Sequence, residues 1–275
     1  MSEPGELRVI PVHGLPEIEA GAKLGRLIAE HVELADGDVV VVSQKIVSKA
    51  EDRTRRLDSV TPGSEAQRLA KELGKDPALV QLVLDESREI LRAERGVLIT
   101  ETHHGLVCAN AGIDSSNLPD DDAVCLLPLD PDASARRIRS ELVDVGGGEP
   151  GAGLAGHSAR SASAEARPRL PSTHGVAISD SFGRAWRLGQ AEAAIGCAGL
   201  IPLDDWRGRR DAHDQELEAT VIAIADQAAG AADLVRAKDS RVPAAIVRGL
   251  ARFITAEDGP GAAALRRPRR DDLFR

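Results

Sequence analysis

Apolar residues follow two kinds of pattern along this chain: short continuous runs, and positions repeated at three- and four-residue steps. The short runs are typical of buried strands, and the repeats are typical of amphipathic helices. The runs predict strands at 7–11, 39–42, 97–100, 106–109, 123–127, 176–179 and 243–247. The repeats predict helices at 17–32, 64–73, 77–92, 131–143 and 217–235. Because the two kinds alternate irregularly, we predict a mixed α/β or α+β fold rather than a regular doubly wound sheet.

The pattern disappears between residues 146 and 175, which are rich in Gly, Ala, Ser and Pro with scattered Arg. Such composition predicts a mobile insertion. The glycines at Gly146 and Gly151 each begin a literal G-x-G-x-x-G match. A dinucleotide loop needs an apolar strand before it and an apolar helix after it, and neither flanks these matches. We therefore interpret the segment as a linker.

Composition and charge narrow the class of protein. The chain has 275 residues, enough for one large domain or two small ones. Hydrophobic residues make up 42%, but aromatic residues make up only 2% and Tyr is absent, so the core must be aliphatic. The formal net charge of −9 argues against nucleic-acid binding through counterion release. With so few aromatics, stacking on single strands is equally disfavoured.

Cysteine content and hydropathy suggest a compartment. Cys108, Cys125 and Cys197 are odd in number and show no C-x-x-C spacing, so we expect buried free thiols rather than disulfides or a zinc site. The opening residues MSEPGELR contain no apolar signal core, and the longest apolar run, at 193–203, is too short for a bilayer. We predict a cytoplasmic protein that has no membrane partner.

Two polar segments offer oxygen ligands at the ends of apolar runs. In the first, Asp114 provides a carboxylate and Asn117 an amide three residues later, although an Asx-capped turn would use the same residues. In the second, Asp180 and Ser181 follow a predicted strand and form a hard oxygen pair suited to Mg²⁺ or Mn²⁺. The alternative for this second pair is a helix N-cap.

Two further segments carry arginines. Arg184 and Arg187 are three residues apart and could face one anion, or could be surface arginines paired with aspartates nearby. Arg207 lies in the segment DWRGRRD at 205–211, whose mixed charges indicate either an ion-pair loop or a recognition loop. Taken alone, neither segment decides between a binding role and a surface role.

Together and in this order, the motifs resemble the coenzyme F-420-0:γ-glutamyl ligase family, whose enzymes add glutamate to a deazaflavin coenzyme. The motifs that carry the resemblance span nearly the whole chain: VHGLP, DGDVVVVSQKIVSKAE, NAGIDSSN, PLDPDASARRIR, ISDSFGRAWRLGQ, AIGCAGL, DWRGRRD and VPAAIVRGL. The ending AAALRRPRRDDLF is similar to the actinobacterial branch. The resemblance implies a ligase domain at 1–260 and a tail at 261–275, without the nitroreductase-like domain that some members carry.

The resemblance also implies a reaction. Such ligases use GTP to convert a substrate carboxylate into an acyl phosphate, which the amine of L-glutamate then attacks, once or more. A pair of divalent cations, Mg²⁺ or Mn²⁺, would be held by Asp114, Asp180 and Ser181, with K⁺ as an additional cation. The fold would have two intertwined lobes in a homodimer, and the partners would be small molecules: the deazaflavin precursor, L-glutamate and GTP. No catalytic residue is identified.

Other residues take their roles from the same resemblance. Lys49 suits phosphate as a point charge, although a solvated lysine on a helix surface is the alternative. Arg184, Arg187 and Arg207 are candidates for substrate binding. The family's GTP contacts correspond to Leu15, Pro16, Glu17, Ile18, Gln44, Lys45, Lys49, Asn117, Arg236, Ala237, Lys238, Asp239, Ser240, Arg241, Val242 and Pro243.

The chain departs from the family pattern at two places. Ser181 replaces the more common Thr and keeps the hydroxyl oxygen. Asp214 and Gln215 stand where members usually carry Gly-Arg, which removes a positive charge. The second change motivates two alternatives: a homologue that binds GTP or deazaflavin without ligation, and an amide ligase for another acidic acceptor. His103 and His104 receive no role.

Overall fold

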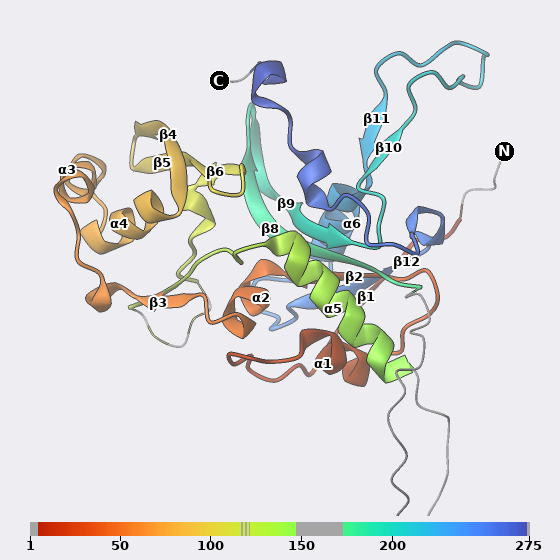
Figure 1. Ribbon diagram of the computed structural model, residues 1–275, viewed down its shortest axis with the longest axis horizontal. Helices are drawn as coiled ribbons and strands as arrows, with labels where there is room; N and C mark the ends of the chain where they lie inside the picture. The colour runs from red at the N-terminus through yellow and green to blue at the C-terminus, as the bar shows by residue number, and fades with distance from the viewer. Residues whose placement is uncertain (1–4, 117, 119, 121, 147–172, 274–275) are drawn as a thin grey trace, which may run out of the picture.

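The computed structural model describes residues 5–116, 118, 120, 122–146 and 173–273. Its centre is a five-stranded sheet with the strand order β1-β12-β2-β8-β9, shown in Figure 1. The strands are β1 (Arg8–Pro11), β12 (Ala244–Arg248), β2 (Val39–Ser43), β8 (Gly175–Arg184) and β9 (Arg187–Ala198). Only β2 and β8 are parallel, and the other neighbouring pairs are antiparallel.

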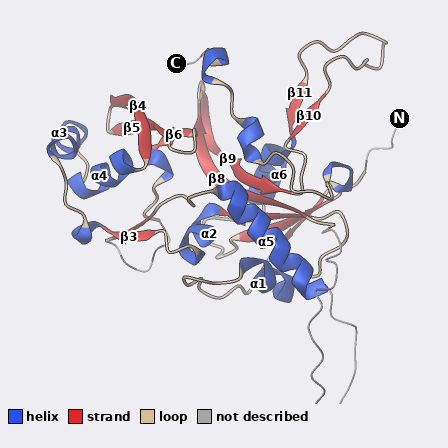
Figure 2. Ribbon diagram, viewed as in Figure 1, coloured by secondary structure: helices blue, strands red, loops and turns tan. Residues whose placement is uncertain are grey.

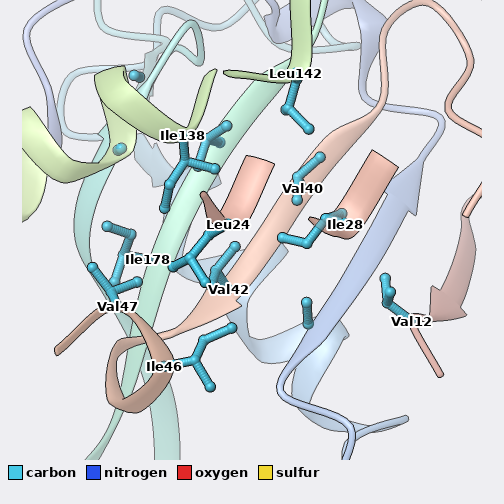
Figure 3. Packing of buried hydrophobic residues seen from close by; sticks show 14 of the residues in the cluster. Val12, Leu24, Ile28, Val40, Val42, Ile46, Val47, Ile138, Leu142 and Ile178 are labelled. Atoms are coloured by element: carbon cyan, nitrogen blue, oxygen red, sulfur yellow. The ribbon is translucent and has the colours of Figure 1, made fainter. Parts of the chain in front are cut away.

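Alternating side chains give the central sheet two buried faces. Val40 and Val42 of β2 belong to one apolar cluster, whereas Val39 and Val41 belong to another, and all four are fully buried. Figure 3 shows the first cluster, where Val40 and Val42 lie near Leu24, Ile28 and Ile138. A run of β-branched residues without polar interruption is what a strand buried on both faces requires.

Helices cover both faces of this sheet. The first apolar cluster packs against α1 (Leu24–His31) and α5 (Pro131–Gly146), and the second packs against α6 (Ile224–Asp233). The close approach of α1 and α5 depends on Gly25, because a Cβ there would lie 2.4 Å from the carbonyl oxygen of Ile138. Figure 2 shows α5 in front of the sheet, with α6 on its far side.

A second, smaller lobe is formed by the middle of the chain. It has its own apolar core, in which Leu69, Val80 and Leu98 are buried. Asp76 caps the second of its two helices by accepting hydrogen bonds from the backbone N–H groups of Ala78 and Leu79. Its elements are β3 (Thr54–Arg56), η1 (Leu57–Ser59), α3 (Ser64–Leu73), α4 (Pro77–Asp85), β4 (Ser87–Glu94), β5 (Val97–Thr102), β6 (Val107–Ala109), η2 (Asn110–Gly112) and β7 (Ala123–Cys125).

The remaining elements surround the central sheet. Helix α2 (Gln44–Ala50) follows β2 directly and is capped by the Ser43 hydroxyl. A two-stranded ribbon of β10 (Leu203–Asp205) and β11 (Val221–Ala223) projects away from the sheet in Figure 1. Short turns of 3₁₀-helix close the chain: η3 (Ala251–Phe253), η4 (Ala262–Leu265) and η5 (Arg269–Asp271).

The mixed α+β fold is confirmed, but three predicted helices were too long. The helix predicted at 17–32 is wrong before residue 24: Gly21 has a φ of 84°, and the segment from Glu17 runs without helical structure. The helix predicted at 77–92 ends at Asp85, since the next residues form β4 and pair with β5. The helix predicted at 217–235 begins only at Ile224, after the strand β11.

Most of the predicted insertion at 146–175 lies outside the described residues, as do the G-x-G-x-x-G match that begins at Gly151 and all of the other match except its first residue, Gly146. Its two ends are ordered differently from the prediction, because Gly146 closes α5 and Gly175 begins β8. All three cysteines are free and buried, as predicted. In the described part of the chain, we find no helix with the length and apolar character needed to cross a membrane.

Candidate active site

One cavity of about 610 Å³ lies beside the smaller lobe, where the parallel pairing of β2 and β8 ends at Ser43 and Ser179. Ligands commonly bind at the carboxyl ends of parallel strands, and this volume is in the usual range for small-molecule sites. Separate parts of the chain line the cavity: Leu15–Ile18, Ser43–Ile46, Lys49, Asp114, Ser116, Leu118, Ser179–Ser181, Glu192, Asp233, Arg236–Asp239 and Arg241–Pro243.

Lys45 and Asp114 join the two lobes across this cavity. The Lys45 Nζ donates to Asp114 Oδ2 at 2.7 Å, and also to the carbonyl and hydroxyl oxygens of Ser116 at 2.6 and 2.8 Å. Burial alone would raise the pKa of Asp114, but the hydrogen bonds from Lys45 and Ser116 outweigh it and lower that pKa. Asp114 is therefore a carboxylate held in its ionised form.

A turn in an unusual backbone conformation places Asp114. Asn110, Ala111 and Gly112 have φ values of 50°, 54° and 72°, all in the left-handed region. Gly adopts this region without cost and Asn tolerates it, so Ala111 is the strained residue of the three. The turn places Asp114 next to β7. There the backbone N–H of Asp114 donates to the carbonyl oxygen of Cys125 at 3.1 Å, and the N–H of Cys125 donates to that of Asp114 at 2.8 Å.

Asp180 contributes a second carboxylate from the middle of β8, directly after the part of that strand that pairs with β2. Its Oδ1 accepts from the backbone N–H of Ser181 at 2.9 Å. Burial raises the pKa of Asp180 to about 7, although the Ser181 N–H opposes that rise, and the neighbouring carboxylates Glu192 and Asp114 add to it. Burial and the neighbouring carboxylates thus disfavour the ionised form of Asp180, and a bound cation would favour it.

Glu192 is a charged residue of the cavity wall that the sequence did not predict. It lies on β9 opposite Ser181, and its Oε1 accepts the Ser181 hydroxyl at 2.5 Å. Its Oε2 accepts from Arg236 Nη2 at 3.1 Å, and Lys238 Nζ lies 3.8 Å from Oε1. The side chains of Glu192 and Arg236 are 6% and 5% exposed, so this ion pair is buried. No strand was predicted over β9, where only the apolar run at 193–203 was noted, and Glu192 lies directly before that run.

Lys49 forms an ion pair with Glu17, and both residues line the cavity. Its Nζ donates to Glu17 Oε1 at 2.5 Å, and its side chain is only 13% exposed. The alternative of a solvated surface lysine is therefore wrong. Both partners come from segments that sequence analysis connected with GTP, and the structure brings those segments together without testing that role.

The predicted site residues separate into three groups. Those on the cavity wall are Leu15, Pro16, Glu17, Ile18, Gln44, Lys45, Lys49, Asp114, Asp180, Ser181, Arg236, Ala237, Lys238, Asp239, Arg241, Val242 and Pro243. Asn117 lies outside the described residues. Ser240, Arg184, Arg187 and Arg207 are not among the lining residues.

The three arginines proposed for substrate lie elsewhere. Arg184 and Arg187 lie opposite each other in the β8–β9 ladder, at the tip of the hairpin. There the Arg184 side chain donates to the carbonyl oxygen of Leu188 at 3.3 Å. Arg207 forms a salt bridge of 2.5 Å with Asp205 on the projecting ribbon. The geometry of Arg207 matches the ion-pair loop, which was the alternative for this segment.

The oxygen ligands suit a hard divalent cation that shares its coordination with a substrate. Within the described ranges, no group of three His, Cys, Asp or Glu side chains could hold a metal by itself. Asp114, Asp180 and the Ser181 hydroxyl nevertheless line one cavity. Mg²⁺ is usually bound in this way, by one or two carboxylates together with waters and substrate phosphates. The residues present therefore fit such a cation.

Comparison with known proteins identifies the family. The family model for F420-0:gamma-glutamyl ligase matches residues 14–149 and 155–249. A coenzyme F420:L-glutamate ligase from Methanothermobacter thermautotrophicus is 40% identical over 275 residues, covering 98% of this chain and 99% of its own length. One of the same name from Methanopyrus kandleri is 39% identical over 272 residues and covers 98% of both chains. The resemblance is confirmed, and the chain belongs to the F420-0:gamma-glutamyl ligase family.

Proposed function

We propose that this chain is a GTP- and divalent-metal-dependent ligase that adds L-glutamate, once or more, to the deazaflavin coenzyme precursor F-420-0. The ligation of glutamate to F420 is the activity that the names of the similar proteins carry. The observation that carries the finer proposal is the cavity, where lysine and arginine side chains from two stretches of the chain, 45–49 and 236–241, lie beside carboxylates that include Asp114, Asp180 and Glu192. Phosphoryl transfer requires this combination of cationic groups and metal-binding oxygens.

The proposed reaction has two steps. First, a carboxylate oxygen of the precursor attacks the γ-phosphorus of GTP, forming an acyl phosphate and releasing GDP. The amine of glutamate then attacks the acyl carbon, so that an amide bond forms, inorganic phosphate leaves and the ammonium loses its protons to solvent. The lysines that line the cavity, Lys45, Lys49 and Lys238, would contact phosphate oxygens in the first step.

The metal would be held by this chain's oxygens. Asp114, Asp180 and Ser181 are the proposed ligands, with Mg²⁺ or Mn²⁺ as the cations and K⁺ as an additional one. When bound, such cations neutralise charge on the transferred phosphoryl group. In the structure, Lys45 donates to Asp114 and Lys238 donates to the Ser181 hydroxyl, both at 2.7 Å. Both lysines would be released toward phosphate once a cation took their place.

We further propose a homodimer with intertwined lobes. The support, besides the family resemblance, is a pair of large apolar side chains at the hairpin tip, where Trp186 is 81% exposed and Leu188 is 99% exposed. Apolar side chains of this size, exposed together, are typical of protein interaction sites.

Two substitutions test the assignment of the ligands. Asp114→Asn and Asp180→Asn should each lower kcat/KM for ligation by about 100-fold or more, because each removes a charge that holds a cation on the phosphates. Asp58→Asn is the matched control, since Asp58 is an exposed carboxylate paired with Arg56 on the smaller lobe. Ligation at the wild-type rate in either site variant would contradict the proposed metal ligands.

The same assay separates the alternatives raised by Asp214 and Gln215. Neither residue lines the cavity, and Asp214 instead pairs with Arg210 at 3.1 Å on the projecting ribbon. Metal-dependent GTP binding without GDP release would identify a binder. GDP release with a different acidic acceptor, but none with F-420-0, would identify an altered ligase.

A further inference from the structure

Glu192 has a geometry that the proposed chemistry does not yet use. It faces Ser181 across the β8–β9 ladder, so both side chains emerge on the same face of the hairpin. The side chain of Glu192 is 6% exposed and lies on the cavity wall. A buried carboxylate is costly unless its oxygens are satisfied, so the contacts of Glu192 are informative.

Both carboxylate oxygens of Glu192 are occupied by different donors. Oε2 accepts from Arg236 Nη2, which also donates to the Ser179 hydroxyl at 3.0 Å. The guanidinium therefore holds the carboxylate in one orientation. This leaves Oε1 directed at the Ser181 hydroxyl, whose hydrogen it accepts at 2.5 Å.

The consequence for Ser181 follows from the valence of a hydroxyl group. A serine oxygen carries one hydrogen and two lone pairs. With its hydrogen directed to Glu192, Ser181 can act toward the cavity only as an acceptor. In the structure Ser181 Oγ does accept a hydrogen bond from a cationic group, the ammonium of Lys238, at 2.7 Å.

We infer that Glu192 is a positioning residue, which takes the hydroxyl hydrogen of Ser181 and thereby turns the lone pairs of Ser181 toward a divalent cation in the cavity. The inference rests on the proposed function, because it assumes that Ser181 binds a metal. Residues behind a metal ligand fix its orientation in this way, and their loss weakens metal binding by about 10- to 100-fold. Arg236 acts one step further back by orienting Glu192.

The test is a double-mutant cycle on metal affinity in the full chain. Mn²⁺ binding is measured by electron paramagnetic resonance in the presence of GDP, with protein-free Mn²⁺ and GDP as the blank. The variants are Glu192→Gln, Ser181→Ala and the two combined. Glu141→Gln is the matched control, because Glu141 is an equally buried glutamate that accepts from the Gly25 N–H on α1 and does not line the cavity.

We expect Glu192→Gln to weaken Mn²⁺ binding by about tenfold. In the Ser181→Ala background the same substitution should change affinity by less than about twofold, because the hydroxyl through which Glu192 acts is gone. The control should bind as the wild type does. Ser181→Thr, which keeps the hydroxyl, should retain the dependence on Glu192.

Two results would overturn the inference. Wild-type Mn²⁺ affinity in Glu192→Gln would show that Glu192 does not position a ligand. If Glu192→Gln lowered Mn²⁺ affinity equally with and without the Ser181 hydroxyl, Glu192 would act by its own charge or as a metal ligand. In both cases the proposed metal dependence would stand, whereas a wild-type protein that binds no Mn²⁺ would remove that dependence and this inference together.

Folding of the variants is checked by their thermal melting. Glu192→Gln leaves the buried Arg236 without its countercharge, which is strongly destabilising in general. If that variant does not fold, Glu192→Gln combined with Arg236→Met removes the whole ion pair. Mn²⁺ affinity is then compared between the wild type and this double variant, each with and without Ser181→Ala. The two results given above would overturn the inference here as well.

Discussion

At the scale of single residues, the cavity is organised by lysines that shield carboxylates. Lys45 contacts Asp114 and Ser116, and its side chain is only 14% exposed. The side chain of Lys49 is similarly buried, at 13% exposed, and contacts Glu17. Hydrogen bonds between charged groups are stronger than those between neutral groups, so these lysines hold their carboxylate partners in fixed positions. In the proposed reaction, a phosphate group would compete with the carboxylates for the lysines.

Lys45→Met tests this picture in the ligation assay. The loss of one charged hydrogen bond to phosphate should raise the KM for GTP by about tenfold or more. Lys71→Met is the control, because Lys71 is an exposed residue of α3 and is remote from the lining of the cavity. An unchanged KM in the Lys45 variant would show that this lysine only holds the two lobes together.

A pH-dependent contribution to stability is expected from Asp226. Burial raises the pKa of this carboxyl, although the backbone N–H of Ala194, which donates to it at 2.8 Å, opposes the rise. The folded protein thus keeps the proton of Asp226 to a higher pH than the unfolded chain. Its stabilising effect is complete below pH 3.8, the ordinary value, and is lost as pH rises through the raised folded pKa.

Asp226→Asn removes this titration while keeping an oxygen for the Ala194 N–H. The free energy of unfolding of the variant, relative to that of the wild type, should therefore increase as pH rises above about 4. Urea denaturation at a series of pH values measures the difference. A difference that is constant with pH, or one that falls, would contradict the raised pKa.

At the scale of elements, the sequence predicted strands better than helix ends. Apolar runs such as Val39–Ser43 became strands because burial on both faces demands such a run. Helix ends depend on local conformations that periodicity does not reveal, such as the positive φ of Gly21. The helix predicted across residue 86 failed because β4 gains a hydrogen-bonding partner in β5, which is a tertiary effect.

Gly25→Ala tests the packing of α1 on α5. An added Cβ would lie 2.4 Å from the Ile138 carbonyl oxygen and 2.6 Å from the Glu141 Cβ, so the helices would have to separate. We expect a loss of about 1–3 kcal/mol in the free energy of unfolding.

Gly230→Ala is the matched control for that substitution. This glycine lies inside α6, and a Cβ there would meet no atom within 4 Å. Alanine should then stabilise the helix by about 0.5–1 kcal/mol, through propensity alone. Equal losses in the two variants, measured by chemical denaturation, would contradict the account of α1 packing.

At the scale of the whole molecule, the cavity could be predicted only in part. Taken one by one, the motifs indicated only which segments carry polar chemistry. It was the family resemblance that implied a shared site for residues as distant as Lys45, Asp114 and Arg236, which line one cavity. The recognition of β9 as a strand would have revealed Glu192, because its alternation places Glu192 beside Ser181. Arg207, a candidate for substrate binding, forms an ion pair with Asp205 in the structure, outside the lining of the cavity.

The proposed homodimer makes a prediction about mass. Light scattering coupled to size-exclusion chromatography should give about twice the chain mass of 29.0 kDa. Replacing the exposed Trp186 and Leu188 by serine should shift the protein toward the monomer, because these side chains lose their apolar contact. A wild-type protein with the mass of one chain would contradict the proposal.

The most direct test of the whole account is ligation itself. The purified chain is incubated with F-420-0, L-glutamate, GTP and Mn²⁺, and the products are identified by mass spectrometry. The account predicts that the precursor gains the mass of one or more glutamyl residues, with one GDP released for each. GTP that remains intact beside an unchanged precursor, in a protein shown to bind both, would contradict it.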